Sequence, residues 1–162
     1  MNVYWCGVKV HMVYTTHVLT GGALGTMVSS PLLALLGGIV LHHVLDMVPH
    51  LDPGYYFPDL KKWKDKNLII AVVVDLAIGT GVILALWHFQ NLPNTVLWGA
   101  LGSMLPDLID NHPWSQATRR LPLLKQYHWF HHYFHWTATQ KQVALGIATQ
   151  VILIAISVII LV

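Results

Sequence analysis

Apolar runs separated by short polar breaks cover most of the chain and predict an all-α protein. They indicate five helices, at about residues 16–28, 31–48, 67–89, 93–110 and 142–162. The third is long enough to cross a bilayer, which takes about 20 apolar residues. The first, second and fourth are shorter, so we expect them to tilt, to re-enter the membrane or to pack on the others. The expected fold is an integral membrane helical bundle of about five helices plus a short interfacial helix.

The ends of these runs carry local helix signals. Pro31, which follows a serine pair, suits the first turn of the second helix, and Pro49 stops that helix. Thr15 or Thr16 can serve as the N-cap of the first helix. Glycine in a membrane helix permits close contact with a neighbouring helix, and the first helix holds three of them: Gly21, Gly22 and Gly25.

The interfacial helix is predicted at residues 125–136, a segment rich in histidine and aromatic residues. Four histidines follow the i, i+3, i+4, i+7 spacing, which predicts one helical stripe: His128, His131, His132 and His135. Aromatic side chains fill the remaining surface and suit the headgroup layer of a membrane. We expect the stripe to face inward, with about two of its imidazoles binding a metal and the others packing or carrying protons.

The composition strengthens the membrane interpretation. Of the 162 residues, 55% are hydrophobic and only 10% are charged, with no glutamate, whereas soluble domains carry about 25% charged residues. We therefore expect a single membrane-embedded domain over residues 1–162, in which residues 1–11 are a leader or an extension because Met12 offers another start. A net charge of +2 is too small to indicate nucleic-acid binding. The lone Cys6 excludes an internal disulfide and a cysteine-based zinc site.

Basic residues occur in two groups that predict the topology. One group is Lys61, Lys62, Lys64 and Lys66, and the other is Arg119, Arg120, Lys125 and Lys141. Because no lysine or arginine lies between them, the third and fourth helices form a hairpin with both groups on one side. The positive-inside rule assigns that side to the cytoplasm. We expect an integral inner-membrane protein.

The same topology brings histidine and aspartate side chains to the cytoplasmic ends of several helices. His42 and Asp46 are four residues apart and share one helix face. His50 is the next step along that face, beyond the bend expected at Pro49, and His43 points about 100° away. Imidazole and carboxylate groups bind divalent metals, and ionisable groups inside a membrane are costly unless they are paired or metal-bound.

A second acidic pair, Asp107 and Asp110, ends the fourth helix and shares one face. Two neighbouring carboxylates raise one pKa unless a cation lies between them, and they oppose the dipole at a helix C-terminus. A metal or Arg119 and Arg120 can supply the compensating charge. The alternative at each cluster is a polar pair that caps a helix end.

Together these clusters predict a site for one or two divalent ions, with zinc favoured by the histidine content and manganese or iron as alternatives. The predicted ligands are His17, His42, Asp46, His50, Asp107, His128, His131 and His132. Asp110 or Asp52 is the candidate general base. The choice between His42 and His43 stays open, and Asp75 in the third helix is expected to pair with a histidine, to orient a ligand or to make a polar pair inside the bundle.

Several short motifs resemble a known family. Thr16-His17 is followed by Gly21-Gly22, Leu41-His42 precedes Asp46 by the spacing of one helical turn, and Leu105-Pro106-Asp107 precedes the histidine-rich segment. This pattern resembles the small inner-membrane metal-dependent hydrolases (the YdjM-like family), although Asp110 lies one residue later than the second acid of their Pro-Asp-x-Asp motif. It is also distantly similar to the His/Asp sites of zinc-dependent phospholipases C. The resemblance implies a hydrolase.

The expected function is metal-dependent hydrolysis of a phosphoester or other ester near the cytoplasmic membrane surface. The expected partners are membrane lipids and an anionic lipid or phosphoester substrate. One alternative is a non-enzymatic metal-binding, transport or scaffold protein, with Asp75 on an ion path. Another is a membrane di-iron oxygenase, because the segment from His128 to His132 fits a His-x-x-His-His box.

Overall fold

The computed structural model describes residues 13–51, 66–110 and 120–162. Within these ranges the chain is all-α, as expected, and its only β-type pairing is an isolated bridge between His50 and Thr137. Six α-helices and one 3-10 turn follow in order: α1 (Tyr14–Thr26), α2 (Pro31–Asp46), α4 (Lys66–Phe89), α5 (Thr95–Asp110), α7 (Pro122–Phe134), η2 (Gln140–Gln142) and α8 (Val143–Leu161). Each predicted helix is present, with bounds that differ by a few residues.

The start of α1 differs from the prediction. Val13 occupies the N-cap and no side chain caps the helix, so the prediction of Thr15 or Thr16 as N-cap is wrong. Thr15 lies inside the first turn, and its hydroxyl donates to Asp75 Oδ1 of α4 at 2.7 Å. The Thr15 hydroxyl, which the local sequence suggested as a helix cap, instead bonds to a residue of another helix.

The ends of α2 and α7 also differ from the prediction, and both differences have the same cause. α2 ends at Asp46, whose carbonyl accepts from the Trp136 backbone N–H at 2.8 Å, and the His50 carbonyl accepts from Ala138 N–H at 2.9 Å. These two bonds hold residues 136–138 extended beside residues 46–50. His135 therefore follows the end of α7 with extended backbone, and the prediction that four imidazoles share one helical stripe is wrong.

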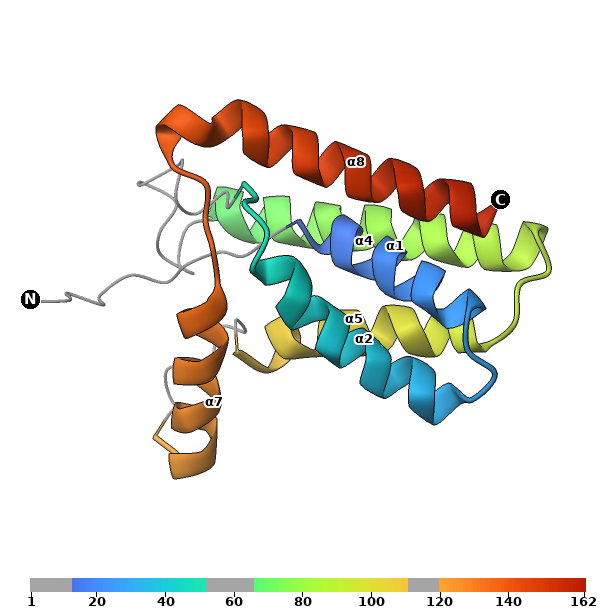
Figure 1. Cartoon of the computed structure of the whole chain (residues 1–162), viewed down its shortest axis with the longest axis horizontal. Helices are drawn as coiled ribbons and strands as arrows, with labels where there is room; N and C mark the ends of the chain where they lie inside the picture. The colour runs from blue at the N-terminus through green and yellow to red at the C-terminus, as the bar shows by residue number, and fades with distance from the viewer. Residues whose placement is uncertain (1–12, 52–65, 111–119) are drawn as a thin grey trace, which may run out of the picture.

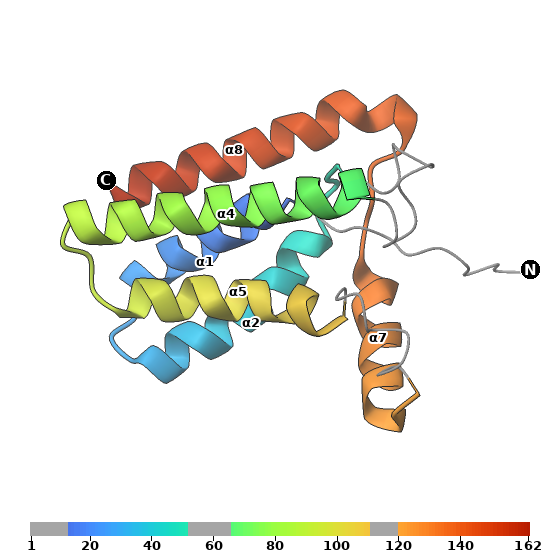
Figure 2. The same cartoon turned by 180° about the vertical axis from the view of Figure 1, so that it is seen from behind.

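α1 is the central helix of the bundle. It contacts α2, α4, α5 and α8, and nearly all of its residues are buried. The apolar core forms around it, from Val18, Leu19, Ala23, Ile83, Val96, Ala100 and Leu161. Figures 1 and 2 show α7 lying across one end of the bundle, beside the ends of α2 and α5, whereas the α1–α2 and α4–α5 turns lie at the opposite end.

Small residues let α5 pack closely between α1 and α2. A Cβ at Gly21 of α1 would meet the Gly99 carbonyl and, at 2.5 Å, Ser103 Cβ. A Cβ at Gly38 of α2 would meet the same carbonyl and lie 2.8 Å from Ser103 N. This is the close backbone approach expected for glycines in membrane helices. Its consequence is that the ligand-bearing ends of the three helices converge.

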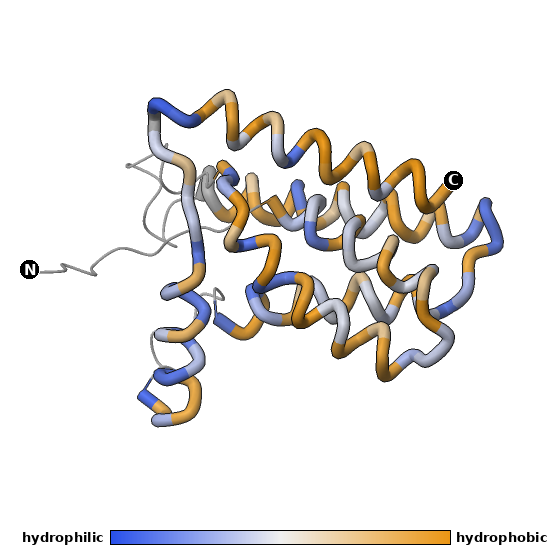
Figure 3. The backbone as a smooth tube through the Cα atoms, in the orientation of Figure 1, coloured by the Kyte–Doolittle hydropathy of each residue, from blue (hydrophilic) through white to orange (hydrophobic). Residues whose placement is uncertain are grey.

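Two helices are long and apolar enough to cross a membrane, Ile69–Phe89 within α4 and Val143–Leu161 of α8. Only 11% and 17% of their apolar windows are buried by the rest of the described chain. The backbone of α4 and α8 is coloured largely as hydrophobic in Figure 3, and many of the apolar side chains on these helices are exposed. A helix that is apolar all round is found in a large core or in a membrane, and the low burial favours the membrane.

Candidate metal centre

Eight buried histidine and aspartate residues gather where α7 crosses the bundle. None is more than 9% exposed; they are His17, His42, Asp46, His50, Asp107, Asp110, His131 and His135. Three of the eight are carboxylates, and a buried charge is tolerated only when opposite charge and hydrogen bonds compensate it. The cluster therefore requires positive charge, either as protonated imidazole or as a bound cation.

The Asp46 carboxylate lies at the centre of this cluster. Its Oδ2 atom lies 3.0 Å from His131 Nε2, 3.2 Å from His42 Nε2 and 3.3 Å from His135 Nδ1. Its Oδ1 atom lies 3.4 Å from His17 Nε2. The i, i+4 spacing of α2 places His42 and Asp46 on one face, whereas the other three histidines arrive from α1 and from the end of α7.

His42 and His131 face each other through their Nε2 atoms, which are 3.1 Å apart. His42 Nδ1–H donates to the Ser103 carbonyl at 2.8 Å, so a neutral His42 presents a lone pair at Nε2. Pro106 has no N–H to donate to the Gly102 carbonyl, and the missing hydrogen bond loosens the helix locally. The adjacent carbonyl, that of Ser103, is the one that accepts from His42. Metal-binding histidines usually donate their other ring N–H in this way.

Asp110 holds His131 from the other side. Its Oδ2 atom lies 3.2 Å from His131 Nδ1 and 3.2 Å from His132 Nε2, and its Oδ1 atom lies 2.8 Å from His128 Nδ1. A carboxylate that accepts from one ring nitrogen leaves the other nitrogen directed at the site, which is the carboxylate–histidine pair common behind metal ligands. Asp110 thus fixes the orientation of His131 toward Asp46.

The protonation of His131 reflects these carboxylates. Burial alone would lower its pKa, but hydrogen bonds with Asp110 and Asp46 and the charge of Asp107 outweigh burial and raise the pKa to about 10. At neutral pH the metal-free cluster therefore keeps a proton on this imidazole. A divalent ion at the same place would supply the positive charge instead.

A second histidine pair lies next to Asp46 at the end of α7. His50 Nδ1–H donates to the Val48 carbonyl at 2.8 Å, and His50 Nε2 lies 2.9 Å from His135 Nε2. Burial, and then the neighbouring His135, lower the pKa of His50 to about 3, so this imidazole is neutral, the form that binds metals. The Thr149 hydroxyl of α8 donates to the Pro49 carbonyl at 2.6 Å and anchors the segment that carries His50.

His17 completes the cluster from α1. Its ring stacks on His42 with centroids 4.2 Å apart, and it is fully buried. Within the described chain neither of its ring nitrogens makes a hydrogen bond. Burying an unbonded polar group costs about 1–3 kcal/mol, and a metal bond would remove that cost. His17, His42 and Asp107 can direct one atom each toward a common point, all within 4.8 Å of one another.

The donor spacing fits a divalent metal. Two nitrogen ligands at about 2.0–2.1 Å from a tetrahedral ion lie about 3.3 Å apart, close to the 2.9–3.4 Å separations around Asp46. The described residues form three inner groups, which share members: His42, His43, Asp46 and His131; His17, His42 and Asp107; Asp46, His50 and His135. Because Asp46 and His42 belong to two groups each, the cluster suits one ion or two neighbouring ions.

The structure thus brings six of the predicted ligands together, namely His17, His42, Asp46, His50, Asp107 and His131. His128 and His132 instead form an outer, half-buried group with Asp110. Asp52 lies outside the described residues. His43 is half-buried against Phe130 of α7, with ring centroids 5.3 Å apart, yet it stays within reach of the His42 group.

Two contributors were not among the predicted site residues. His135 was named only as part of the stripe, although its four-residue spacing from His131 matched that of Asp46 and His50 and could have marked it. The Ser103 carbonyl carries no sequence signal, because any residue has a carbonyl. Asp75 pairs with Thr15, and a polar pair inside the bundle was one of its expected roles.

Comparison with known proteins adds no assignment. No protein-family model, no curated protein and no solved structure matches this chain significantly. Function is therefore inferred from the geometry of the buried cluster and from the sequence motifs that contribute to it.

Proposed function

We propose that this protein is a membrane-embedded, metal-dependent hydrolase whose centre is the Asp46 cluster. The observation that carries the proposal is one buried carboxylate within 3.4 Å of four imidazole nitrogens, from His17, His42, His131 and His135. The cluster would hold one or two divalent ions, and the predominance of nitrogen donors favours zinc.

The surrounding residues give the cluster the supporting contacts expected of a metal centre. The Ser103 carbonyl orients His42, the Val48 carbonyl orients His50, and Asp110 orients His131. A bound zinc ion lowers the pKa of its water to about 7 and supplies hydroxide at neutral pH. Because Asp110 already accepts from His128 and His131 and lies 3.2 Å from His132 Nε2, we assign it to positioning His131, and Asp52 remains the candidate general base.

The proposed reaction is hydrolysis of a phosphoester or other ester at the membrane surface. One water is divided across the scissile bond: its hydroxyl joins the phosphorus or the carbonyl carbon, and its proton joins the leaving oxygen. No oxidant is consumed. The basic residues that flank the cluster in sequence, among them Arg120, Lys125 and Lys141, would attract an anionic substrate. By the positive-inside rule they assign this end to the cytoplasmic side of the inner membrane.

The resemblance to the YdjM-like hydrolases supports the proposal in one respect. The residues of its separate motifs, His17, His42, Asp46 and Asp107, lie far apart in sequence and yet belong to one buried cluster. Convergence of this kind is what a shared metal site requires, and a set of unrelated helix caps would not produce it.

A non-enzymatic metal-binding role is the second candidate, and burial favours it. Structural metal sites are closed, whereas catalytic sites keep an open position for water or substrate. The inner ligands are almost fully inaccessible. Whether the site is enzymatic or non-enzymatic depends on whether a substrate can reach the cluster. The relevant surface for such access is the side next to His135.

Elemental analysis of detergent-purified protein tests the metal centre. We expect one or two zinc ions per chain in the wild type and loss of metal in the double variant Asp46→Ala with Asp107→Ala. The matched control is Asp75→Asn, an acidic residue outside the cluster that pairs with Thr15; it should keep its metal. Full metal occupancy in the double variant, or no metal in any protein, would overturn the proposal, and stoichiometric iron would favour the oxygenase alternative.

Hydrolysis is tested separately with p-nitrophenyl phosphate and bis-p-nitrophenyl phosphate. The zinc-loaded wild type should release nitrophenolate from at least one of them, and the metal-free double variant should not. Metal bound at full stoichiometry without turnover of either compound would favour the non-enzymatic role.

A further inference from the structure

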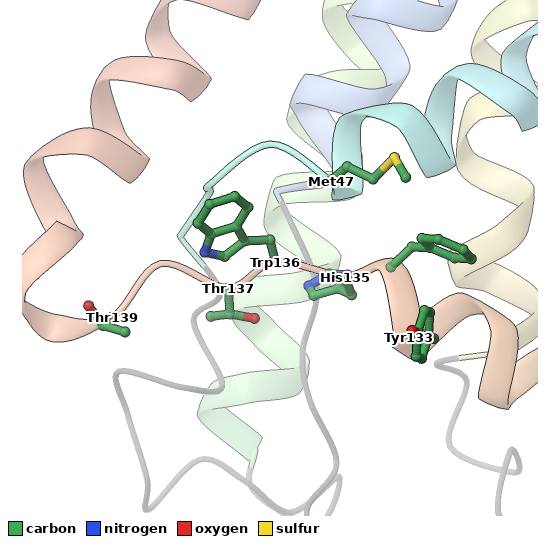
Figure 4. Close-up of a pocket in the computed structure, with 7 residues that line it drawn as sticks. Met47, Tyr133, His135, Trp136, Thr137 and Thr139 are labelled. Atoms are coloured by element: carbon green, nitrogen blue, oxygen red, sulfur yellow. The ribbon is translucent and has the colours of Figure 1, made fainter.

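One cavity lies directly beside the candidate metal centre. It is open to the surface, has a volume of about 580 Å³ and is lined by Met47, Tyr133, Phe134, His135, Trp136, Thr137 and Thr139 (Figure 4). Ligand pockets usually measure about 300–1,000 Å³, so the cavity is large enough for a small organic group. His135, one of the lining residues, also belongs to the centre: its side chain is fully buried, with Nδ1 3.3 Å from Asp46 Oδ2.

The lining of the cavity is amphiphilic. Met47, Phe134 and Trp136 supply apolar surface, whereas Tyr133 and Thr139 contribute exposed side chains that carry a hydroxyl. Trp136 is 52% exposed and Tyr133 is 67% exposed. Exposed aromatic residues with a polar tip are typical of the membrane–water interface, so the mouth of the cavity is placed where lipid headgroups lie.

An exposed apolar stripe leads along α2 to this cavity. Leu33, Leu36, Val40, Val44 and Met47 follow spacings of three and four residues, which place them on one helix face, and each is at least 47% exposed. The last of them, Met47, is itself part of the cavity lining. The stretch from Leu36 to Met47 rises about 17 Å along the helix, close to the roughly 15 Å depth of one leaflet.

We propose that the stripe and the cavity together bind a membrane phospholipid, with an acyl chain along α2 and the phosphate headgroup in the cavity beside His135. This assignment rests on the proposed function, since it names the substrate class of the same centre. A lipid suits the surface because it is apolar along the part that would face α2 and anionic where the histidines begin. The bilayer around α4 and α8 also delivers acyl chains to α2 without a separate partner.

Photo-crosslinking tests the binding site without requiring hydrolysis. The full chain is reconstituted in phosphatidylcholine vesicles containing phosphatidic acid with a diazirine on one acyl chain, and labelled residues are mapped by mass spectrometry. We expect labelling at Val44, Met47 or Trp136 that an excess of unlabelled phosphatidic acid suppresses. Equal, uncompeted labelling of α2 and of the exposed residue Ile78 on α4 would show bulk-lipid contact only and would overturn the proposal.

Kinetics separate this proposal from the general hydrolase proposal. Val44→Trp narrows the path to the cavity, and Ile78→Trp places the same side chain on the exposed face of α4. With metal content unchanged, Val44→Trp should raise KM for phosphatidic acid about tenfold, whereas Ile78→Trp should leave it as in the wild type. An equal KM for phosphatidic acid in the two variants would overturn lipid binding at α2, while loss of all turnover with competed crosslinking intact would overturn only the hydrolase.

Discussion

At the residue scale, Asp46 and His131 show how the cluster is balanced. Asp46 is 1% exposed and contacts four histidines, and His131 lies between Asp46 and Asp110. Burial lowers the pKa of His50 while hydrogen bonds raise that of His131, so the metal-free cluster holds a proton on His131 and none on His50. A bound metal ion would therefore replace the positive charge of protonated His131 with its own charge.

This exchange predicts proton release from His131 when the first metal binds. In the metal-free protein the pKa of about 10 keeps His131 protonated at pH 7.5, and a metal bond at Nε2 requires its loss. Zinc titration calorimetry in buffers with different ionisation enthalpies should show about one proton released per first ion. Apparent affinity should rise with pH below pH 10, since protons compete less. No proton release would contradict the assignment of His131 as a ligand.

At the element scale, small residues decide how closely the ligand-bearing helices approach. α5 lies against α1 through Gly21 and Gly99 and against α2 through Gly38 and Gly102. A side chain at any of these positions would meet backbone atoms, which cannot move aside as a flexible side chain can. The spacing of His17, His42 and Asp107 thus depends on glycines about one to two turns away.

Gly99→Ala tests this dependence. Its Cβ would meet the Gly21 carbonyl and lie 3.2 Å from Gly25 N, so α1 and α5 must separate. We expect a loss of about 1–3 kcal/mol in the free energy of unfolding, measured by denaturant titration in detergent, together with weaker metal retention. Gly81→Ala is the control, because nothing lies within 4 Å of its Cβ, and alanine there should be neutral or stabilising. Equal stability of the two variants would contradict the packing argument.

At the scale of the whole molecule, the bundle has two unlike ends. The histidine and aspartate cluster and α7 lie at one end, and the short turns after α1 and α4 lie at the other (Figure 1). The exposed apolar surfaces of α4 and α8 extend between them. This arrangement suits a membrane protein whose chemistry takes place at one surface.

Cysteine labelling tests which surface that is. In a variant without Cys6, Leu123→Cys reports on the α7 end and Gln90→Cys on the opposite end; both positions are exposed. By the positive-inside rule, an impermeant maleimide should label position 90 in intact cells and position 123 only after the membrane is opened. The reverse pattern would place the centre on the outer side, and labelling of both positions in intact cells would contradict a membrane-spanning fold.

The sequence by itself determined which segments are helices, that the fold is all-α, and which residue types lie at one end of the bundle. These features depend on runs of apolar residues and on breaks such as Pro31, which act over a few neighbouring positions. It also indicated that His42 and Asp46 lie on one helix face, because residues four apart in a helix are neighbours on its surface.

Only the tertiary structure decided the contacts between segments distant in sequence. The separation of His50 and His135 is 85 residues, and their pairing depends on backbone bonds from residues 136–138 to residues 46–50. The contact between His42 and the Ser103 carbonyl was also decided by helix packing, because any residue could supply a carbonyl. So was the hydrogen bond from the Thr15 hydroxyl to Asp75, which replaces the helix cap expected from the sequence. Local periodicity carries no information about such partners, because they are chosen by helix packing and by the need to satisfy buried polar groups.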